Sequence, residues 1–152
     1  GTRKPIVVSS PFGGQRLHSM RAMEAATGAT GSFACLAMTS PPLMLDSVCC
    51  TKTAASAELD VPLVLAPSVS AGTQGPASLS ACVAVANAEV LAGITLAQLT
   101  EPGAPVLYGS STTAMDLRLA AASVGSPECA LISAGVAQLA RQYRLPSYIA
   151  GA

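Results

Sequence analysis

Charged residues are scarce in this sequence. Only 11% of its 152 residues are charged, whereas about 25% is usual for a globular domain. Eight basic residues balance eight acidic ones, so the chain has no basic field that would attract nucleic acid. Because a free-standing domain carries more surface charge than this, we expect further polypeptide or a partner to cover much of the outer surface. A second copy of the chain, forming a homo-oligomer, is one such partner.

The sequence contains a single histidine and none of the familiar catalytic motifs. His18 is the only histidine, and no CxxC pair occurs among the five cysteines, which argues against a zinc site. The odd cysteine count and the adjacent pair Cys49 and Cys50 predict reduced, mostly buried thiols in a cytoplasmic protein. The sequence has no GxSxG, Walker A or HExxH motif. Short motifs therefore name no reaction.

No signal peptide precedes the first apolar segment, and the chain does not begin with Met, which suits a processed or excised piece. The longest apolar run, from Leu79 to Leu99, is long enough to be tested as a membrane span. Asn87 and Glu89 lie at its centre, where a carboxylate is costly in a bilayer, so we expect no membrane partner.

Glu89 also needs a partner if the run is a buried helix. Its neighbours three and four positions away on such a helix are Ala, Val and Gly, and none of them offers a donor side chain. We therefore expect another element of the fold to satisfy this carboxylate. Two interpretations stay open: a tie from the helix to a neighbouring loop, or a carboxylate that reaches a binding pocket.

A repeating unit organises the rest of the chain. Short apolar runs that end in Gly or small polar residues occur at 4–10, 33–41, 61–72, 104–111 and 145–151, and all but the second open with Pro. Such runs are typical of parallel strands buried on both faces. Between them, apolar spacing and the capping residues Asp46 and Ser126 predict helices at 15–26, 46–59, 78–99 and 126–143. This alternation predicts a parallel sheet with right-handed crossovers.

Two architectures fit the alternation. One is a part of a (β/α)8 TIM-type barrel, with about four βα units and a fifth strand forming a single partial domain over residues 1–152. The other is a five-stranded doubly wound sheet that is complete in itself. The low charge and the apolar long helix favour the partial barrel. In both folds ligands meet the carboxyl ends of the strands, and Tyr108 there either lines a pocket or packs in the core.

Longer motifs add a family resemblance. NAEVLAG followed by PGAPVLYG, within residues 75–118, and the later SPECALISAGVAQLARQYRLPSYIAG carry it. Residues 62–152 resemble the trimethylamine methyltransferase family, the corrinoid-dependent methylamine and betaine methyltransferases. The resemblance implies a TIM-type barrel longer than this chain. It also implies methyl transfer from trimethylamine or a quaternary amine such as glycine betaine to the Co(I) centre of a separate corrinoid protein, with no cofactor or metal held by this chain.

The resemblance also bears on the substrate site. One branch of the family contains pyrrolysine, which would fall at or just beyond Gly151 and Ala152; another branch lacks it and uses quaternary amines. An amine cation is held by aromatic faces and carboxylates, so the expected substrate-binding residues at the strand ends are Tyr108, Ser110, Glu89, Tyr148 and Gly151. The catalytic residues stay unassigned. We expect the isolated chain to be inactive, and the alternative function is a non-catalytic α/β binding or assembly module.

Overall fold

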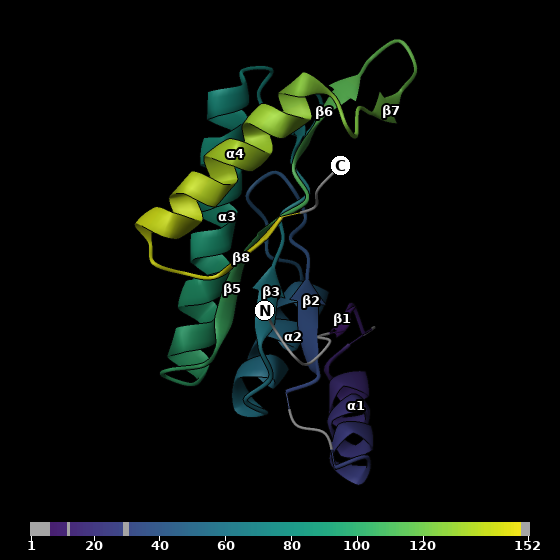
Figure 1. The fold of residues 1–152 in the computed structure, drawn as a ribbon, viewed down its shortest axis with the longest axis vertical. Helices are drawn as coiled ribbons and strands as arrows, with labels where there is room; N and C mark the ends of the chain where they lie inside the picture. Colours follow the sequence, from purple (N-terminus) through teal and green to yellow (C-terminus); the bar gives the residue numbers. More distant parts are fainter. Residues whose placement is uncertain (1–6, 12, 29–30, 150–152) are drawn as a thin grey trace.

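The computed structural model describes residues 7–11, 13–28 and 31–149. A parallel sheet forms its centre (Figure 1). Its strands follow one another in chain order and are β1 (Val7–Ser9), β2 (Phe33–Ala37), β3 (Leu63–Leu65), β5 (Val106–Ser110) and β8 (Ser147–Ile149). Four helices connect them: α1 (Gly14–Ala26), α2 (Ser47–Glu58), α3 (Leu79–Thr100) and α4 (Pro127–Gln142). The predicted alternation of strands and helices is confirmed.

The strand order decides between the two predicted architectures. A doubly wound sheet reverses its strand order at a switch point, but here every neighbour pair is parallel and the order never reverses. All four helices also pack on the same face of the sheet, in one core that includes Leu17, Ala55, Val90 and Val136. The fold is therefore a curled half-barrel, part of a TIM-type barrel, and the doubly wound alternative is wrong.

The opposite face of the sheet has its own apolar layer, formed by strand residues and by Ala66, which directly follows β3. Its members are Val8, Ala34, Leu36, Val64, Ala66 and Leu107. Side chains alternate between the two faces along each strand. In β2 and β3 the even-numbered residues belong to this second layer, whereas odd-numbered residues such as Cys35 and Leu65 face the helices. In a complete barrel this layer would be the interior, so we call it the inner face.

The helix boundaries follow from local chemistry that the sequence displays. Asp46 caps α2 by accepting a hydrogen bond from the backbone N–H of Cys49 at 2.7 Å. Ser126 caps α4 in the same way, and Pro127 and Glu128 form its first turn. These residues satisfy or complement the free N–H groups at a helix start. Both caps were predicted from the sequence.

A small second sheet was not predicted. It consists of β4 (Ser70–Ala71), β6 (Thr113–Asp116) and β7 (Ala121–Ala122). β6 and β7 form a hairpin that projects from one end of the half-barrel (Figure 1). β4 and β6 follow β3 and β5 directly and pair in parallel. The second sheet therefore ties together the loops at the carboxyl ends of two neighbouring strands of the main sheet.

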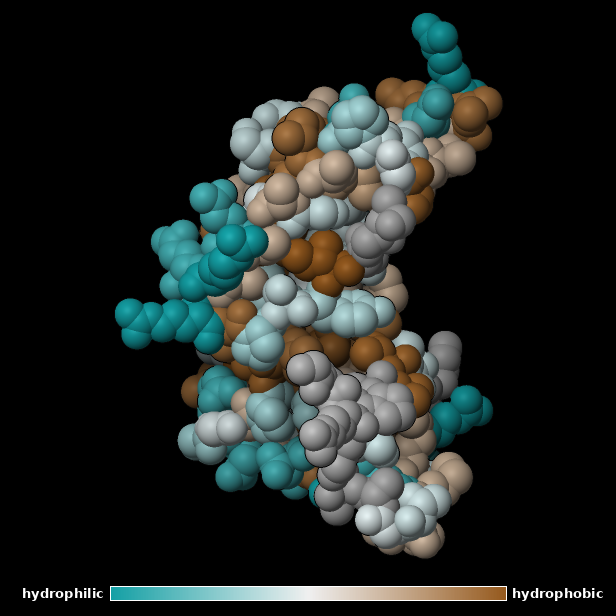
Figure 2. All heavy atoms as spheres, in the orientation of Figure 1, coloured by the Kyte–Doolittle hydropathy of each residue, from teal (hydrophilic) through white to brown (hydrophobic). Residues whose placement is uncertain are grey.

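Helix α3 is long and apolar enough to cross a membrane by length and composition. In this fold it packs against α2, α4 and the sheet. Its outer face carries small residues and the exposed Leu99. Figure 2 shows one side of the molecule, on which hydrophilic residues gather near the edges and hydrophobic residues cross the middle.

Candidate active site at the carboxyl ends of the strands

Glu89 lies near the middle of α3 and is 2% exposed. Its carboxylate accepts hydrogen bonds from the Thr39 hydroxyl and from the backbone N–H of Leu43, the latter at 2.7 Å. Both donors belong to the loop that follows β2. The expectation that another element satisfies Glu89 is confirmed, and the contacts are those of a tie between helix and loop. Substrate contact by Glu89 stays a prediction.

Tyr108 and Asn87 form a second link between helix and sheet. Tyr108 donates to Asn87 Oδ1 at 2.7 Å, and Asn87 Nδ2 donates to the Tyr143 hydroxyl at 3.2 Å. The two tyrosine rings stack with centroids 6.0 Å apart. Burial raises the pKa of the Tyr108 phenol, and the neighbouring Tyr143 adds to that shift. Tyr108 thus faces the helices and packs in the core, which is one of its two expected positions. Substrate contact by Tyr108 stays a prediction.

Ser110 ends β5 and is buried. Its hydroxyl accepts a hydrogen bond from the backbone N–H of Thr112 at 3.0 Å. The same turn is fixed to the loop after β3, because the backbone N–H of Ser111 donates to the Pro67 carbonyl at 2.8 Å. In this structure the Ser110 hydroxyl shapes the strand-end turn, and its role toward substrate stays a prediction.

Tyr148 lies on β8, close to the carboxyl ends of the strands. Its register partner is Gly109, one residue along β5 from the helix-facing Tyr108. Residue 148 therefore belongs to the inner face, like Leu107. The side chain is about one third exposed. Of the predicted aromatic residues, Tyr148 is the one placed to offer a ring to a ligand inside the half-barrel.

Gly109 explains how closely the strands approach at this point. A Cβ atom there would lie 2.5 Å from the Leu65 carbonyl oxygen and 2.9 Å from a Val64 methyl group. Only glycine fits so near the backbone of the adjacent strand. The remaining predicted residue, Gly151, lies outside the described residues, as does the expected pyrrolysine position. The structure thus places Tyr148 on the inner face, whereas Tyr108 and Glu89 point into the helix layer.

Sequence reasoning missed several contributors to the strand-end region. Thr39 and Leu43 hold Glu89, and Tyr143 completes the Asn87 network. At the opposite end of the sheet, Gln98 bonds to Gly103 and Ala104 in the turn before β5. The available signal was the polar residue inside an apolar helix. It says that a partner exists, but it does not identify a partner distant in the chain.

The cysteines do not form a reactive centre among the described residues. All five are free, and four of them are buried. Burial raises the pKa of Cys35, Cys49 and Cys82, to about 11 for Cys49. A thiol with a raised pKa stays protonated and is a poor nucleophile at neutral pH. In the part of the chain that the structure describes, no three His, Cys, Asp or Glu side chains gather as metal ligands.

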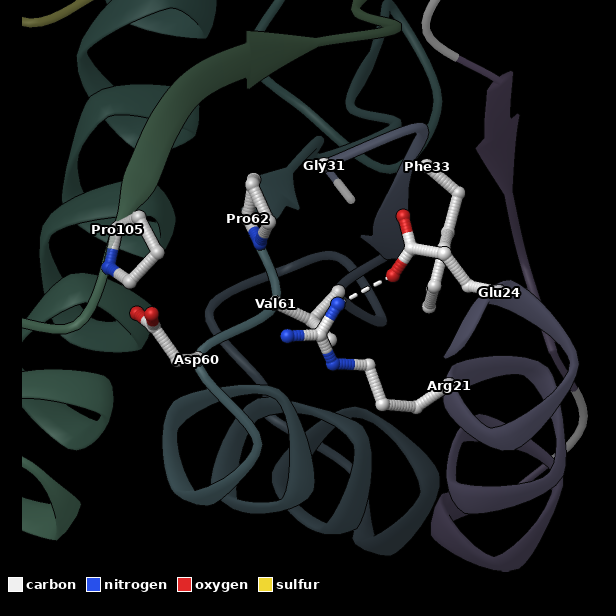
Figure 3. Close-up of a pocket in the computed structure, with 8 residues that line it drawn as sticks. All are labelled: Arg21, Glu24, Gly31, Phe33, Asp60, Val61, Pro62 and Pro105. Carbon is white, nitrogen blue, oxygen red and sulfur yellow. Dashed lines mark hydrogen bonds and ion pairs between the residues drawn. The ribbon is translucent and has the colours of Figure 1, made fainter. Parts of the chain in front are cut away.

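A cavity of about 400 Å³ opens at the opposite end of the strands (Figure 3). Phe33, Pro62 and Pro105 line it where β2, β3 and β5 begin. Arg21 points at Glu24 across one wall, and Asp60 projects from the turn before β3. Substrate sites in barrel enzymes lie at the other, carboxyl-terminal face. We therefore assign the candidate site to the strand ends that include Tyr148 and not to this cavity.

Comparison with known proteins finds one matching family and several curated relatives. The sequence profile of the family described as trimethylamine methyltransferase (MTTB) matches residues 8–152. The trimethylamine methyltransferase MttB of Methanosarcina barkeri is 47% identical over 119 residues, which cover 78% of this chain and 24% of that protein. The glycine betaine methyltransferase of Desulfitobacterium hafniense (strain Y51) is 47% identical over 110 residues, 72% of this chain and 23% of that protein. The chain spans about a quarter of the length of these relatives.

Proposed function

The chain belongs to the trimethylamine methyltransferase family, and from this membership we propose that it forms part of an enzyme that removes a methyl group from trimethylamine or from a quaternary amine such as glycine betaine. The curated relatives are named for these two substrates. The acceptor we propose is the corrinoid of a separate protein, as the family resemblance implies. We further propose that the enzyme acts in the cytoplasm.

Two observations together carry this proposal. The family profile matches residues 8–152, and the described part of this range folds as a half-barrel. The strand ends of this half-barrel supply an exposed aromatic ring, Tyr148, on the inner face. A quaternary ammonium is held by the face of such a ring because the ring's quadrupole attracts the cation. The Tyr148 ring would bind and orient the amine, with its methyl groups toward the open side of the half-barrel.

A quaternary amine has no proton to lose, so its methyl transfer needs no general base. The nucleophile attacks the methyl carbon, the C–N bond breaks, and the amine leaves as a neutral tertiary amine with the bonding electron pair. The reduced corrinoid supplies the nucleophile when the partner protein is bound. The contribution of this chain is to position the cation and to keep the methyl carbon accessible from one side.

The test uses a chimera in which this chain replaces the matching part of a full-length relative. In the glycine betaine methyltransferase of D. hafniense, the 110 residues that match this chain are replaced by the corresponding residues of this chain. We expect the chimera to methylate the reduced corrinoid protein with trimethylamine or glycine betaine, measured from the visible spectrum of the corrinoid. A chimera that folds, judged by circular dichroism, but transfers no methyl group from either amine would contradict the proposal.

A further inference from the structure

The cavity at the amino-terminal ends of the strands carries charges of both signs (Figure 3). Its volume of about 400 Å³ suits a small molecule. Phe33, Pro62 and Pro105 make part of its wall apolar, and Arg21 and Asp60 add a guanidinium and a carboxylate. The cavity thus offers a cation, an anion and an apolar surface to one ligand.

Glu24 holds Arg21 in place and leaves most of the guanidinium free. One oxygen of the buried Glu24 carboxylate accepts from the Ser32 N–H at 2.6 Å and from the Ser32 hydroxyl at 2.8 Å, and the other accepts from Arg21. A guanidinium has five N–H donors, and within the described residues the Arg21 side chain makes only this one hydrogen bond. Figure 3 shows a second guanidinium nitrogen turned away from Glu24, toward the side of the cavity where Asp60 projects. Arg21 is therefore oriented to receive an anion inside the cavity.

Asp60 occupies a turn position that favours glycine. It follows Leu59, the C-cap of α2, and has a φ of 51°. The N–H of Asp60 donates to the Ala57 carbonyl at 3.2 Å, and the N–H of Val61 donates to the Ser56 carbonyl at 3.0 Å, which is the hydrogen-bond pattern that usually has glycine at the left-handed residue. A carboxylate at the carboxyl end of a helix is also unfavourable. Because Asp60 forms no ion pair within the described residues, local stability does not explain its charge.

We propose that this cavity binds a small zwitterion, whose carboxylate pairs with Arg21 and whose ammonium pairs with Asp60. A guanidinium binds a carboxylate through directed, charge-assisted hydrogen bonds, and the apolar part of the ligand lies against Phe33. Two sources share this chemistry: an α-amino acid, whose ammonium has N–H donors, and a betaine, whose quaternary ammonium has none. The site lies at the opposite end of the sheet from Tyr148, and it does not depend on methyl transfer by the chain.

The experiment titrates glycine betaine and L-alanine into the ¹⁵N-labelled chain at pH 7, with acetate and choline as probes that carry one charge each. We expect at least one zwitterion to shift the Phe33 and Val61 amide signals saturably, and both single-charge probes to bind about tenfold more weakly. Asp60→Asn, which keeps a residue tolerated at positive φ, and Arg21→Gln should each weaken zwitterion binding about tenfold. Glu58→Gln removes an exposed carboxylate that does not line the cavity, and it should leave the affinity unchanged.

Asp60→Gly separates binding from stability. It should bind as weakly as Asp60→Asn but raise the midpoint of thermal unfolding, because glycine suits the turn; a lower midpoint would contradict the proposal by showing that the carboxylate serves the turn. The proposal is also overturned by no saturable shift at Phe33 and Val61 with either zwitterion, by shifts at Tyr148 alone, or by equal affinities for the parent chain, Asp60→Asn and Arg21→Gln. If Arg21→Gln does not fold, the two Asp60 variants decide. Tighter binding of L-alanine assigns an amino acid and tighter binding of glycine betaine assigns a betaine; either result supports the site.

Discussion

Single polar residues fix helix α3 to the rest of the fold. Asn87, Glu89 and Gln98 are the strongly polar residues of the apolar helix α3, and each bonds to a different part of the fold. A buried polar group persists when its hydrogen bonds are satisfied. The three bonds therefore fix the position of α3 against the loop after β2, strand β5 and the turn before β5.

Glu89 gives the first testable consequence. Glu89→Ala leaves the Leu43 N–H and the Thr39 hydroxyl without their acceptor, and we expect it to lower the free energy of unfolding by about 2 kcal/mol. Glu89→Gln keeps the length of the side chain and a carbonyl acceptor for Leu43, so its loss should be clearly smaller. Urea unfolding at pH 7 measures both. Equal stability of Glu89→Ala and the parent chain would contradict the conclusion that Glu89 ties α3 to the loop after β2.

Glu24 gives a pH-dependent consequence. The Ser32 N–H, then the Ser32 hydroxyl and Arg21, lower its pKa from the ordinary 4.5 to about 2. A lowered pKa stabilises the fold above 4.5, and this contribution is lost as the pH falls from 4.5 toward 2. Glu24→Gln should therefore be less stable than the parent at pH 7, and the difference should shrink by pH 3.

The matched control is Glu58→Gln, which changes an exposed carboxylate at the end of α2. Its difference from the parent should be small at both values of pH. A Glu24→Gln difference that stays constant between pH 7 and pH 3 would show that the folded-state carboxylate is not the source of the effect. Denaturant unfolding of the parent chain and both variants at pH 7 and pH 3 gives these four differences in unfolding free energy.

At the scale of helices and strands, much of the fold could be predicted from the sequence. Short apolar runs, most of them opened by Pro, located the strands of the main sheet, and Asp46 and Ser126 located two helix starts. Local residue chemistry determines both features. The small sheet of β4, β6 and β7 was missed, since strands of two to four residues carry too little periodicity to detect. Tyr108 was ambiguous because the facing of a strand residue depends on its register with neighbouring strands.

Two glycines test the packing of these elements. Gly109→Ala would push a methyl group against the Leu65 carbonyl, and we expect a loss of about 1–3 kcal/mol. Gly135→Ala lies inside α4, where a Cβ would be 3.7 Å from the nearest Val83 methyl group, an ordinary contact. We expect that change to stabilise the chain by about 0.5–1 kcal/mol. Thermal unfolding of both variants checks the opposite signs; a neutral Gly109→Ala would contradict the close strand approach.

At the scale of the whole molecule, the half-barrel has two faces with different roles. The helices cover one face and bury Tyr108 between α3 and α4. The inner face carries the second apolar layer and, near the carboxyl ends, the partly exposed ring of Tyr148. This division is what the barrel architecture requires, because substrate enters from the carboxyl ends and the helices form the outside. We propose that the amine is held at that inner face.

The most direct measurement of this claim compares two variants in the chimera described above: Tyr148→Leu and Tyr148→Phe. Phe keeps the ring that attracts a cation, and Leu removes it. We predict that Leu lowers kcat/KM for the methylated amine about tenfold, the size expected for losing a cation–π contact, while Phe stays near the parent value. Equal kcat/KM values for Tyr148→Leu, Tyr148→Phe and the parent chimera would contradict the claim.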